Sequence, residues 1–112
     1  MWVYTLVAAD YDGAALLPHF INYYHQQGVG YRRLLVMVHH TPGRYSRAGL
    51  DAVRGVCMGY HVECRVWTGQ FSSEAHLERM LGMLNDYIAD PHDWVVMADN
   101  DEFQDWGGRP IR

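Results

Sequence analysis

The chain has 112 residues, of which 49% are hydrophobic and 20% charged, and its formal net charge is −4. This length predicts a single domain over residues 1–112, and the composition is that of a globular protein, not of a disordered one. The acidic balance argues against a nucleic-acid-binding protein, which would carry a basic surface. No apolar stretch reaches the roughly 20 residues that a transmembrane helix needs.

The chain begins with a predicted strand followed by a predicted helix. Trp2 to Ala9 is a continuous apolar, β-favouring run, which indicates a strand buried on both faces, as in parallel sheets. Asp10 to Gly13 is a predicted turn, and Asp12 is the candidate N-cap of the helix that follows. Apolar residues at helical spacing extend this helix to Gly28. Because Pro18 interrupts the pattern, we expect a kink, or a short helix followed by a longer one.

The middle of the chain predicts two strands with a weak helix between them. Arg33 to His39 is a second apolar strand, and His40 to Tyr45 contains Thr-Pro-Gly and is expected to be a loop. Ser46 to Met58 has a weaker helical pattern, because glycines interrupt it. His61 to Trp67 alternates between apolar and polar residues, which predicts a strand with one exposed face at a sheet edge. Its apolar face would consist of Val62, Cys64 and Val66.

The last part of the chain contains the clearest helical pattern and a fourth strand. Ser72 and Ser73 are candidate N-caps, and Asp90-Pro91 ends the helix. An apolar stripe at i, i+3, i+4 and i+7 spacing consists of Leu77, Met80, Leu81, Leu84, Tyr87 and Ile88. Asp93 to Ala98 is the fourth predicted strand, and Gln104 to Arg112 shows no clear periodicity.

The predicted order is therefore β-α-β-α-β-α-β. Such alternation indicates the α/β class, with a mostly parallel sheet of about four strands, right-handed crossovers and flanking helices. In open sheets of this kind, ligands bind beyond the carboxyl ends of the strands.

Two acids stand where the fourth strand would end. Asp99 and Asp101 are two residues apart, so on an extended backbone their side chains point to the same side. Hard carboxylate oxygens suit Mg²⁺ or Mn²⁺, which would bridge to phosphate oxygens and offset the charge of a leaving diphosphate. At an effective dielectric of about 20, each pair of unit charges about 4 Å apart contributes roughly 4 kcal/mol. A bare DxD pair is nevertheless common, so the context has to be considered.

Two segments carry a resemblance to a known family. Asp93 to Phe103 resembles the "W-apolar-apolar-apolar-x-D-x-D-E-F" signature of GT-A glycosyltransferases of the family 2-like and family 92-like groups. Leu16 to Val29 resembles their "LLPEWIxYHxxxGV" helix. The resemblance implies the Rossmann-like, donor-binding half of GT-A and a nucleotide-sugar donor, commonly a UDP-sugar. It further implies an Mn²⁺- or Mg²⁺-dependent transfer of a hexosyl group to an unknown acceptor.

The same resemblance implies roles for individual residues. Asp99 would lie near the donor ribose and the metal, and Asp101 would coordinate the metal and thereby the diphosphate. The end of the first strand, Ala8 to Asp12, would form the floor beside the base and includes Ala9 and Asp10. Asp12 would stand in for the acid that the family carries near this point, although it is equally well explained as a helix cap. His39 and His40 stand where many relatives carry an Asp-Asn or Asp-Asp pair that helps to hold the nucleotide. A histidine there could stack on a base or bond a ribose hydroxyl, but the simpler interpretation is two polar loop residues.

Length is the main departure from the family pattern. Only eleven residues follow Asp101, and no catalytic base is identifiable among them. The chain is therefore expected to be a truncated GT-A domain that ends shortly after the motif. One alternative is a non-catalytic nucleotide-sugar-binding or interaction module, and a weaker one is a metal-dependent phosphohydrolase. Relatives occur in the cytoplasm and in the secretory-pathway lumen, so both compartments remain open.

The remaining candidates have simpler explanations. Cys57 and Cys64 are expected to be free, buried thiols, although a disulfide stays open. The scattered histidines show no metal-ligand spacing, and packing or surface roles suffice for them. The tryptophans could stack on a sugar and the arginines could reach phosphate, but core packing and solvated charge are the simpler explanations. These residues are His19, His25, His61, His76, His92, Trp67, Trp94, Trp106, Arg32, Arg33 and Arg109.

Overall fold

A four-stranded parallel sheet forms the centre of the protein. The computed structural model describes residues 1–41, 47–90, 92–98, 103–104 and 110–111. The strands lie in the order β3-β2-β1-β4, and every neighbouring pair is parallel. Their bounds are Trp2–Ala8 for β1, Leu34–His40 for β2, Glu63–Thr68 for β3 and Val95–Met97 for β4. The predicted α/β class and the parallel sheet are confirmed, and the architecture is compatible with a Rossmann-like fold.

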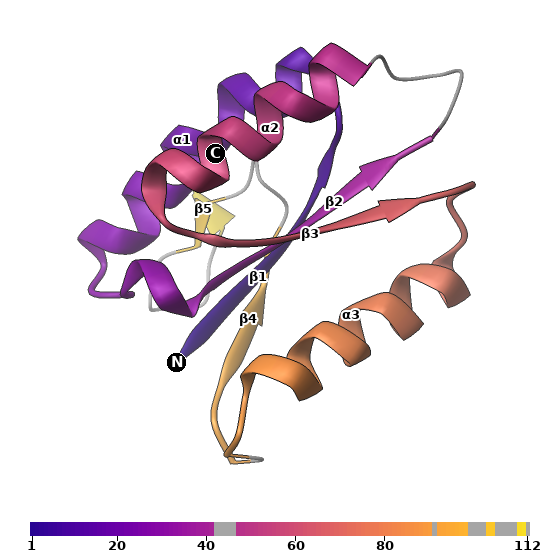
Figure 1. The fold of residues 1–112 in the computed structure, drawn as a ribbon. Coiled ribbons are helices and arrows are strands. Elements are labelled where there is room, and N and C mark those ends of the chain that lie inside the picture. The colour runs from indigo at the N-terminus through magenta and orange to yellow at the C-terminus, as the bar shows by residue number, and fades with distance from the viewer. Residues whose placement is uncertain (42–46, 91, 99–102, 105–109, 112) are drawn as a thin grey trace.

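Three helices cover the two faces of the sheet. Helices α1 (Tyr11–Gln26) and α2 (Arg47–Tyr60) lie together on one face, and α3 (Ser73–Tyr87) lies on the other (Figure 1). Two further elements were not predicted: the 3₁₀ turn Tyr31–Arg33, and an antiparallel ladder of β5 (Phe103–Gln104) with β6 (Pro110–Ile111). Both are too short to leave a periodic pattern in the sequence. None of the described helices is long and apolar enough to cross a membrane.

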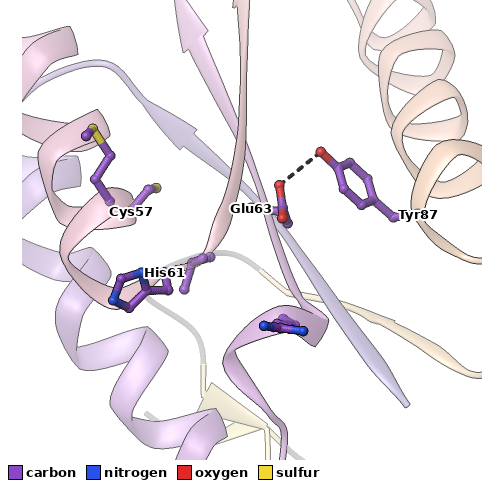
Figure 2. Close-up of a pocket in the computed structure, with 7 residues that line it drawn as sticks. Cys57, His61, Glu63 and Tyr87 are labelled. Carbon is purple, nitrogen blue, oxygen red and sulfur yellow. Dashed lines mark hydrogen bonds between the residues drawn. The ribbon is translucent and has the colours of Figure 1, made fainter.

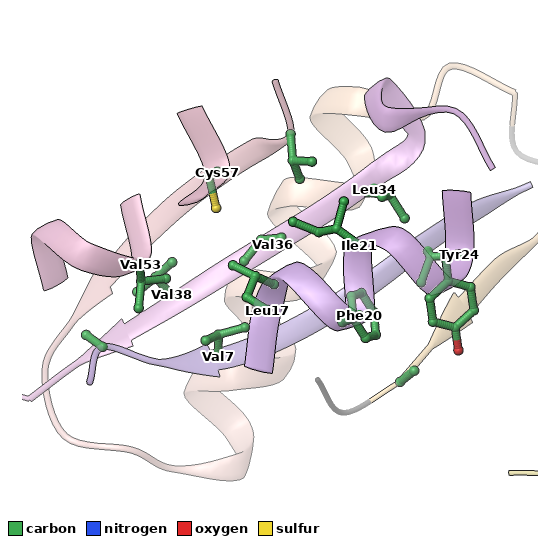
Figure 3. Packing of buried hydrophobic residues seen from close by; sticks show 14 of the residues in the cluster. Val7, Leu17, Phe20, Ile21, Tyr24, Leu34, Val36, Val38, Val53 and Cys57 are labelled. Atoms are coloured by element: carbon green, nitrogen blue, oxygen red, sulfur yellow. The ribbon is translucent and has the colours of Figure 1, made fainter. Parts of the chain in front are cut away.

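The larger hydrophobic core lies between the sheet and the pair α1 and α2. Leu17, Phe20 and Ile21 of α1 are at most 1% exposed, and they pack on Val7 and Val36 of the sheet. Figure 3 shows these side chains filling the space between the helices and the strands. Strand β2 is buried on both faces because it lies inside the sheet, which explains its unbroken apolar run.

Helix α1 begins earlier than expected and is continuous. Its N-cap is Asp10, whose carboxylate accepts a hydrogen bond from the Gly13 amide at 2.6 Å, so the prediction of Asp12 as the cap was wrong. One helix also runs through Pro18, so the predicted division into two helices is wrong. Buried Leu17 and Phe20 flank Pro18 on the sheet side, and their packing holds the helix together despite the missing amide.

Helix α3 buries a face that only partly matches its predicted apolar stripe, because Met80, Leu84 and Tyr87 pack in the core as expected and two leucines do not. Ser72 caps it, as expected, by accepting a hydrogen bond from the Ala75 amide at 3.1 Å. Met80 and Met83 are buried, whereas Leu77 and Leu81 remain about half exposed. Because Met83 is also apolar, the sequence contains two overlapping stripes, and contact with the sheet selects the one that includes Met83.

Strand β3 lies at a sheet edge, as predicted, but its two faces do not divide as expected. Val66, on the face predicted to be apolar, is 38% exposed. Trp67, on the opposite face, is only 3% exposed, because it packs with Met80 and Met83 in the second, smaller core under α3. A single large aromatic side chain therefore changes which face is buried at this end of the strand.

Candidate functional site at the carboxyl edge of the sheet

The carboxyl ends of β1 and β4 form a topological switch point. The order β3-β2-β1-β4 makes the first and fourth strands neighbours and confirms that the third is at an edge. The connections on either side of this point run over opposite faces, because α1 leaves β1 on one face and α3 leads to β4 from the other (Figure 1). In open α/β sheets such a divergence leaves a crevice, which is the usual ligand position.

The backbone of Ala9 forms part of this edge. Ala9 is fully buried, and its amide donates a hydrogen bond to the His39 carbonyl at 3.0 Å. The backbone of α2 comes close here, since a Cβ atom added to Gly49 would lie 2.7 Å from the Ala9 carbonyl oxygen. Ala9 can thus serve as a floor, as predicted, but its methyl group cannot reach a ligand.

Asp10 and Asp12 follow Ala9 but occupy different environments. Asp10 is half-buried and caps α1, so the carboxylate oxygen that accepts the Gly13 amide is already used. Asp12 is exposed in the first turn of α1. Of these two predicted site residues, Asp12 is therefore the one whose carboxylate can reach solvent or a ligand without uncapping the helix.

His39 lies inside β2, together with His40, so the interpretation of the pair as loop residues is wrong. The His39 side chain is 8% exposed, and its Nε2 lies 2.8 Å from the Gly69 carbonyl oxygen. Since a carbonyl oxygen only accepts, Nε2 is the donor in this hydrogen bond. The ring packs on Trp67 at 4.4 Å between centroids. His39 is thus held too firmly and too deeply to offer its face to a base.

An aromatic cluster around His39 was not recognised from the sequence. It consists of His39, Trp67, Phe71 and His76, with ring centroids between 4.4 and 6.2 Å apart. His76 Nε2 lies 3.0 Å from the Tyr4 hydroxyl, and burial raises the pKa of Tyr4. Phe71 is 53% exposed, so it is the ring of this cluster most available to a ligand. These residues come from two strands, a connection and a helix, so no local sequence pattern joins them.

The predicted metal ligands Asp99 and Asp101 lie outside the described residues, as do Trp106 and Arg109. Ala98 is the last described residue before Asp99; it is 7% exposed, and its amide donates to the Tyr4 carbonyl at 3.0 Å. Within the described part of the chain, no three His, Cys, Asp or Glu side chains are grouped to hold a metal ion.

A cavity of about 690 Å³ lies at the opposite, amino edge of the sheet. Cys57, His61, Glu63 and Tyr87 are among its lining residues (Figure 2). The Tyr87 hydroxyl donates to Glu63 Oε2 at 3.0 Å, and the pKa of Tyr87 is raised, chiefly by burial and also by this carboxylate. This cavity lies away from the switch point, so it does not belong to the candidate site.

Comparisons with protein-family models, with curated proteins and with solved structures yield no significant match to this chain.

Proposed function

We propose that this chain binds a nucleotide sugar through a divalent cation at the carboxyl edge of the sheet, as the donor half of a GT-A-like glycosyltransferase. The observation that carries the proposal is the neighbouring position of β1 and β4, with their connecting helices on opposite faces. The chain leaves β4 for Asp99 and Asp101 directly after this switch point. A crevice and two hard-oxygen ligands would then coincide.

The donor set is chemically suited to a cation that carries a diphosphate. Mg²⁺ and Mn²⁺ in such sites are commonly held by one or two carboxylates, and phosphate oxygens and water complete the shell. Asp99 and Asp101 would supply the carboxylates. The cation would then neutralise charge on the diphosphate as the bond to the sugar breaks.

The resemblance of Asp93 to Phe103 and of Leu16 to Val29 supports a sugar nucleotide in preference to a simple phosphate ester. The second segment spans much of α1, which packs against the sheet next to the candidate site. Transfer would deliver a hexosyl group to an acceptor. The nucleotide and the cation are the part of this reaction that the edge residues would bind.

Calorimetry with UDP and Mn²⁺ tests the proposal directly. We expect wild type to bind UDP only when Mn²⁺ is present, and Asp101→Ala to lose at least about tenfold in affinity, which corresponds to about 1.4 kcal/mol. Asp86→Ala is a matched control, because it removes one exposed carboxylate that pairs with Arg65, away from the motif. Equal binding by wild type and Asp101→Ala, or no binding by either, would show that the site assignment is wrong.

A further inference from the structure

The two cysteines of the chain lie against each other, on α2 and β3. Cys57 belongs to the larger core and is 1% exposed, and Cys64 is half-buried against the same cluster. Their thiols share a side-chain hydrogen bond. Figure 3 shows the Cys57 sulfur pointing from α2 toward the sheet. Both cysteines are free thiols in this structure.

The backbone between them holds the pair in place. Helix α2 ends at Tyr60, and the Val62 amide donates to the Cys57 carbonyl at 2.9 Å. His61 makes the reversal in the left-handed region, with φ of 57°. Cys64 then enters β3 opposite Val36 of β2. Because both cysteines belong to ordered, packed elements joined by a tight turn, their contact follows from the fold and does not depend on a flexible loop.

The environments of the two thiols shift their pKa values in opposite directions and favour Cys64 as the nucleophile. The pKa of Cys57 is raised, first by its hydrogen bond to Cys64 and then by burial. The pKa of Cys64 is lowered by the hydrogen bond from Cys57 and, to a smaller extent, by the Arg54 guanidinium. The thiolate is the reactive form. Cys64 is thus the thiol that is both more exposed and more readily ionised.

We infer that Cys57 and Cys64 form a thiol–disulfide exchange site, in which Cys64 reacts first with a low-molecular-weight disulfide and Cys57 completes an intramolecular bond. With glutathione disulfide, the Cys64 thiolate attacks one sulfur and expels one glutathione thiolate. Cys57 then loses its proton and attacks the Cys64 sulfur, which expels the second glutathione. The protein loses two protons and two electrons, which glutathione disulfide takes up to become two glutathione thiols.

The sequence provides a direct readout of this bond. Trypsin cleavage after Arg54 and Arg65 places both cysteines in one peptide, residues 55–65. We expect wild type incubated with glutathione disulfide and then alkylated with N-ethylmaleimide to yield this peptide two hydrogens lighter and without alkyl groups. Reduction with dithiothreitol, followed by alkylation with N-ethylmaleimide, should give the same peptide with two alkylated thiols.

Single substitutions separate the two roles. Cys57→Ser should stop at the mixed disulfide and carry one glutathione on Cys64. Cys64→Ser should react at least about tenfold more slowly, because the remaining thiol is buried. The inference is overturned if the wild-type peptide keeps two alkylated thiols, if it accumulates glutathione adducts, or if oxidation yields dimers instead. The order of attack is overturned if Cys64→Ser reacts as fast as Cys57→Ser.

Discussion

The two faces of the sheet are packed in different ways. The face under α1 and α2 is covered by aliphatic side chains together with Phe20 and Tyr24 in one continuous cluster, and many of them are fully buried. The face under α3 has a smaller cluster, in which Tyr4, Trp67 and three methionines are the largest side chains. Helix α3 contributes Met80 and Met83 to it but leaves Leu77 and Leu81 partly exposed.

This difference shows how each face obtains its stability. The first face depends on close packing of branched side chains. The second combines fewer packing contacts with side-chain hydrogen bonds. The Tyr4 hydroxyl meets His76, and Tyr87 meets Glu63. At the amino edge, Asp93 accepts a hydrogen bond from Trp2 Nε1 at 2.9 Å and so joins the approach to β4 to the start of β1. The second face should therefore tolerate substitution of apolar residues better than the first.

The largest expected effect comes from emptying the first core. Phe20 is 1% exposed, and Phe20→Ala should lower the free energy of unfolding by about 3–5 kcal/mol. Met83→Ala on the other face should cost about 2–3 kcal/mol, because its flexible neighbours can close part of the cavity. Urea titration of both variants measures the difference. If Phe20→Ala does not fold, Phe20→Leu replaces it, with an expected cost of about 1 kcal/mol. A larger loss for Met83→Ala than for Phe20→Ala would contradict the comparison.

Alanine in place of the helical glycines Gly49 and Gly82 should change the stability of the protein in opposite directions, because only Gly49 lacks room for a Cβ atom. A Cβ atom at Gly49 of α2 would lie 2.7 Å from the Ala9 carbonyl oxygen, so Gly49→Ala should destabilise by about 1–3 kcal/mol. Gly82 of α3 has no neighbour within 4 Å of such an atom, and Gly82→Ala should stabilise by about 0.5–1 kcal/mol through helix propensity. Gly55→Ala is the control in α2, because no neighbour lies within 4 Å of a Cβ atom added at Gly55. Thermal unfolding of the three variants would refute the comparison if all shifted in the same direction.

The smallest effect is expected on the outer side of α3. Leu77→Gln and Leu81→Gln should change the free energy of unfolding by no more than about 0.5 kcal/mol, because both side chains are already about half exposed. Urea titration of both leucine variants, compared with that of Met83→Ala, tests this expectation. A cost near that of Met83→Ala for either leucine variant would mean that the apolar stripe seen in the sequence, and not the observed face, packs on the sheet.

The class of the fold could be predicted because its signals are local and repeated. The apolar run of β2 and the serine cap of α3 each fall within a few residues and lead to the observed element. The burial of α3 could not be predicted in the same way, because Leu81 and Met83 are equally apolar. Only the position of the sheet beneath the helix separates them.

The candidate site could be predicted only where a residue stands at the end of a predicted strand. Ala9 is the last residue of the first predicted strand, so its place at the carboxyl edge could be predicted. That β4 ends beside it depends on the strand order β3-β2-β1-β4. Trp67 and Phe71 could not be recognised as neighbours of His39, because Trp67 lies on another strand and Phe71 lies in the connection that follows it. Asp12 and Asp10 both precede the helix interior, and only the hydrogen bond to Gly13 identifies Asp10 as the cap.

The pairing of β1 with β4 also has a consequence for synthesis on the ribosome. Trp2 pairs with Val95, so the contact spans almost the whole chain. Strands β1, β2 and β3 can pair as they emerge, but one edge of β1 has no partner until α3 has crossed the sheet and β4 has been made. An unpaired strand edge is a template for other chains. We therefore expect ribosome-bound fragments that end before Val95 to be the most aggregation-prone intermediates of this protein.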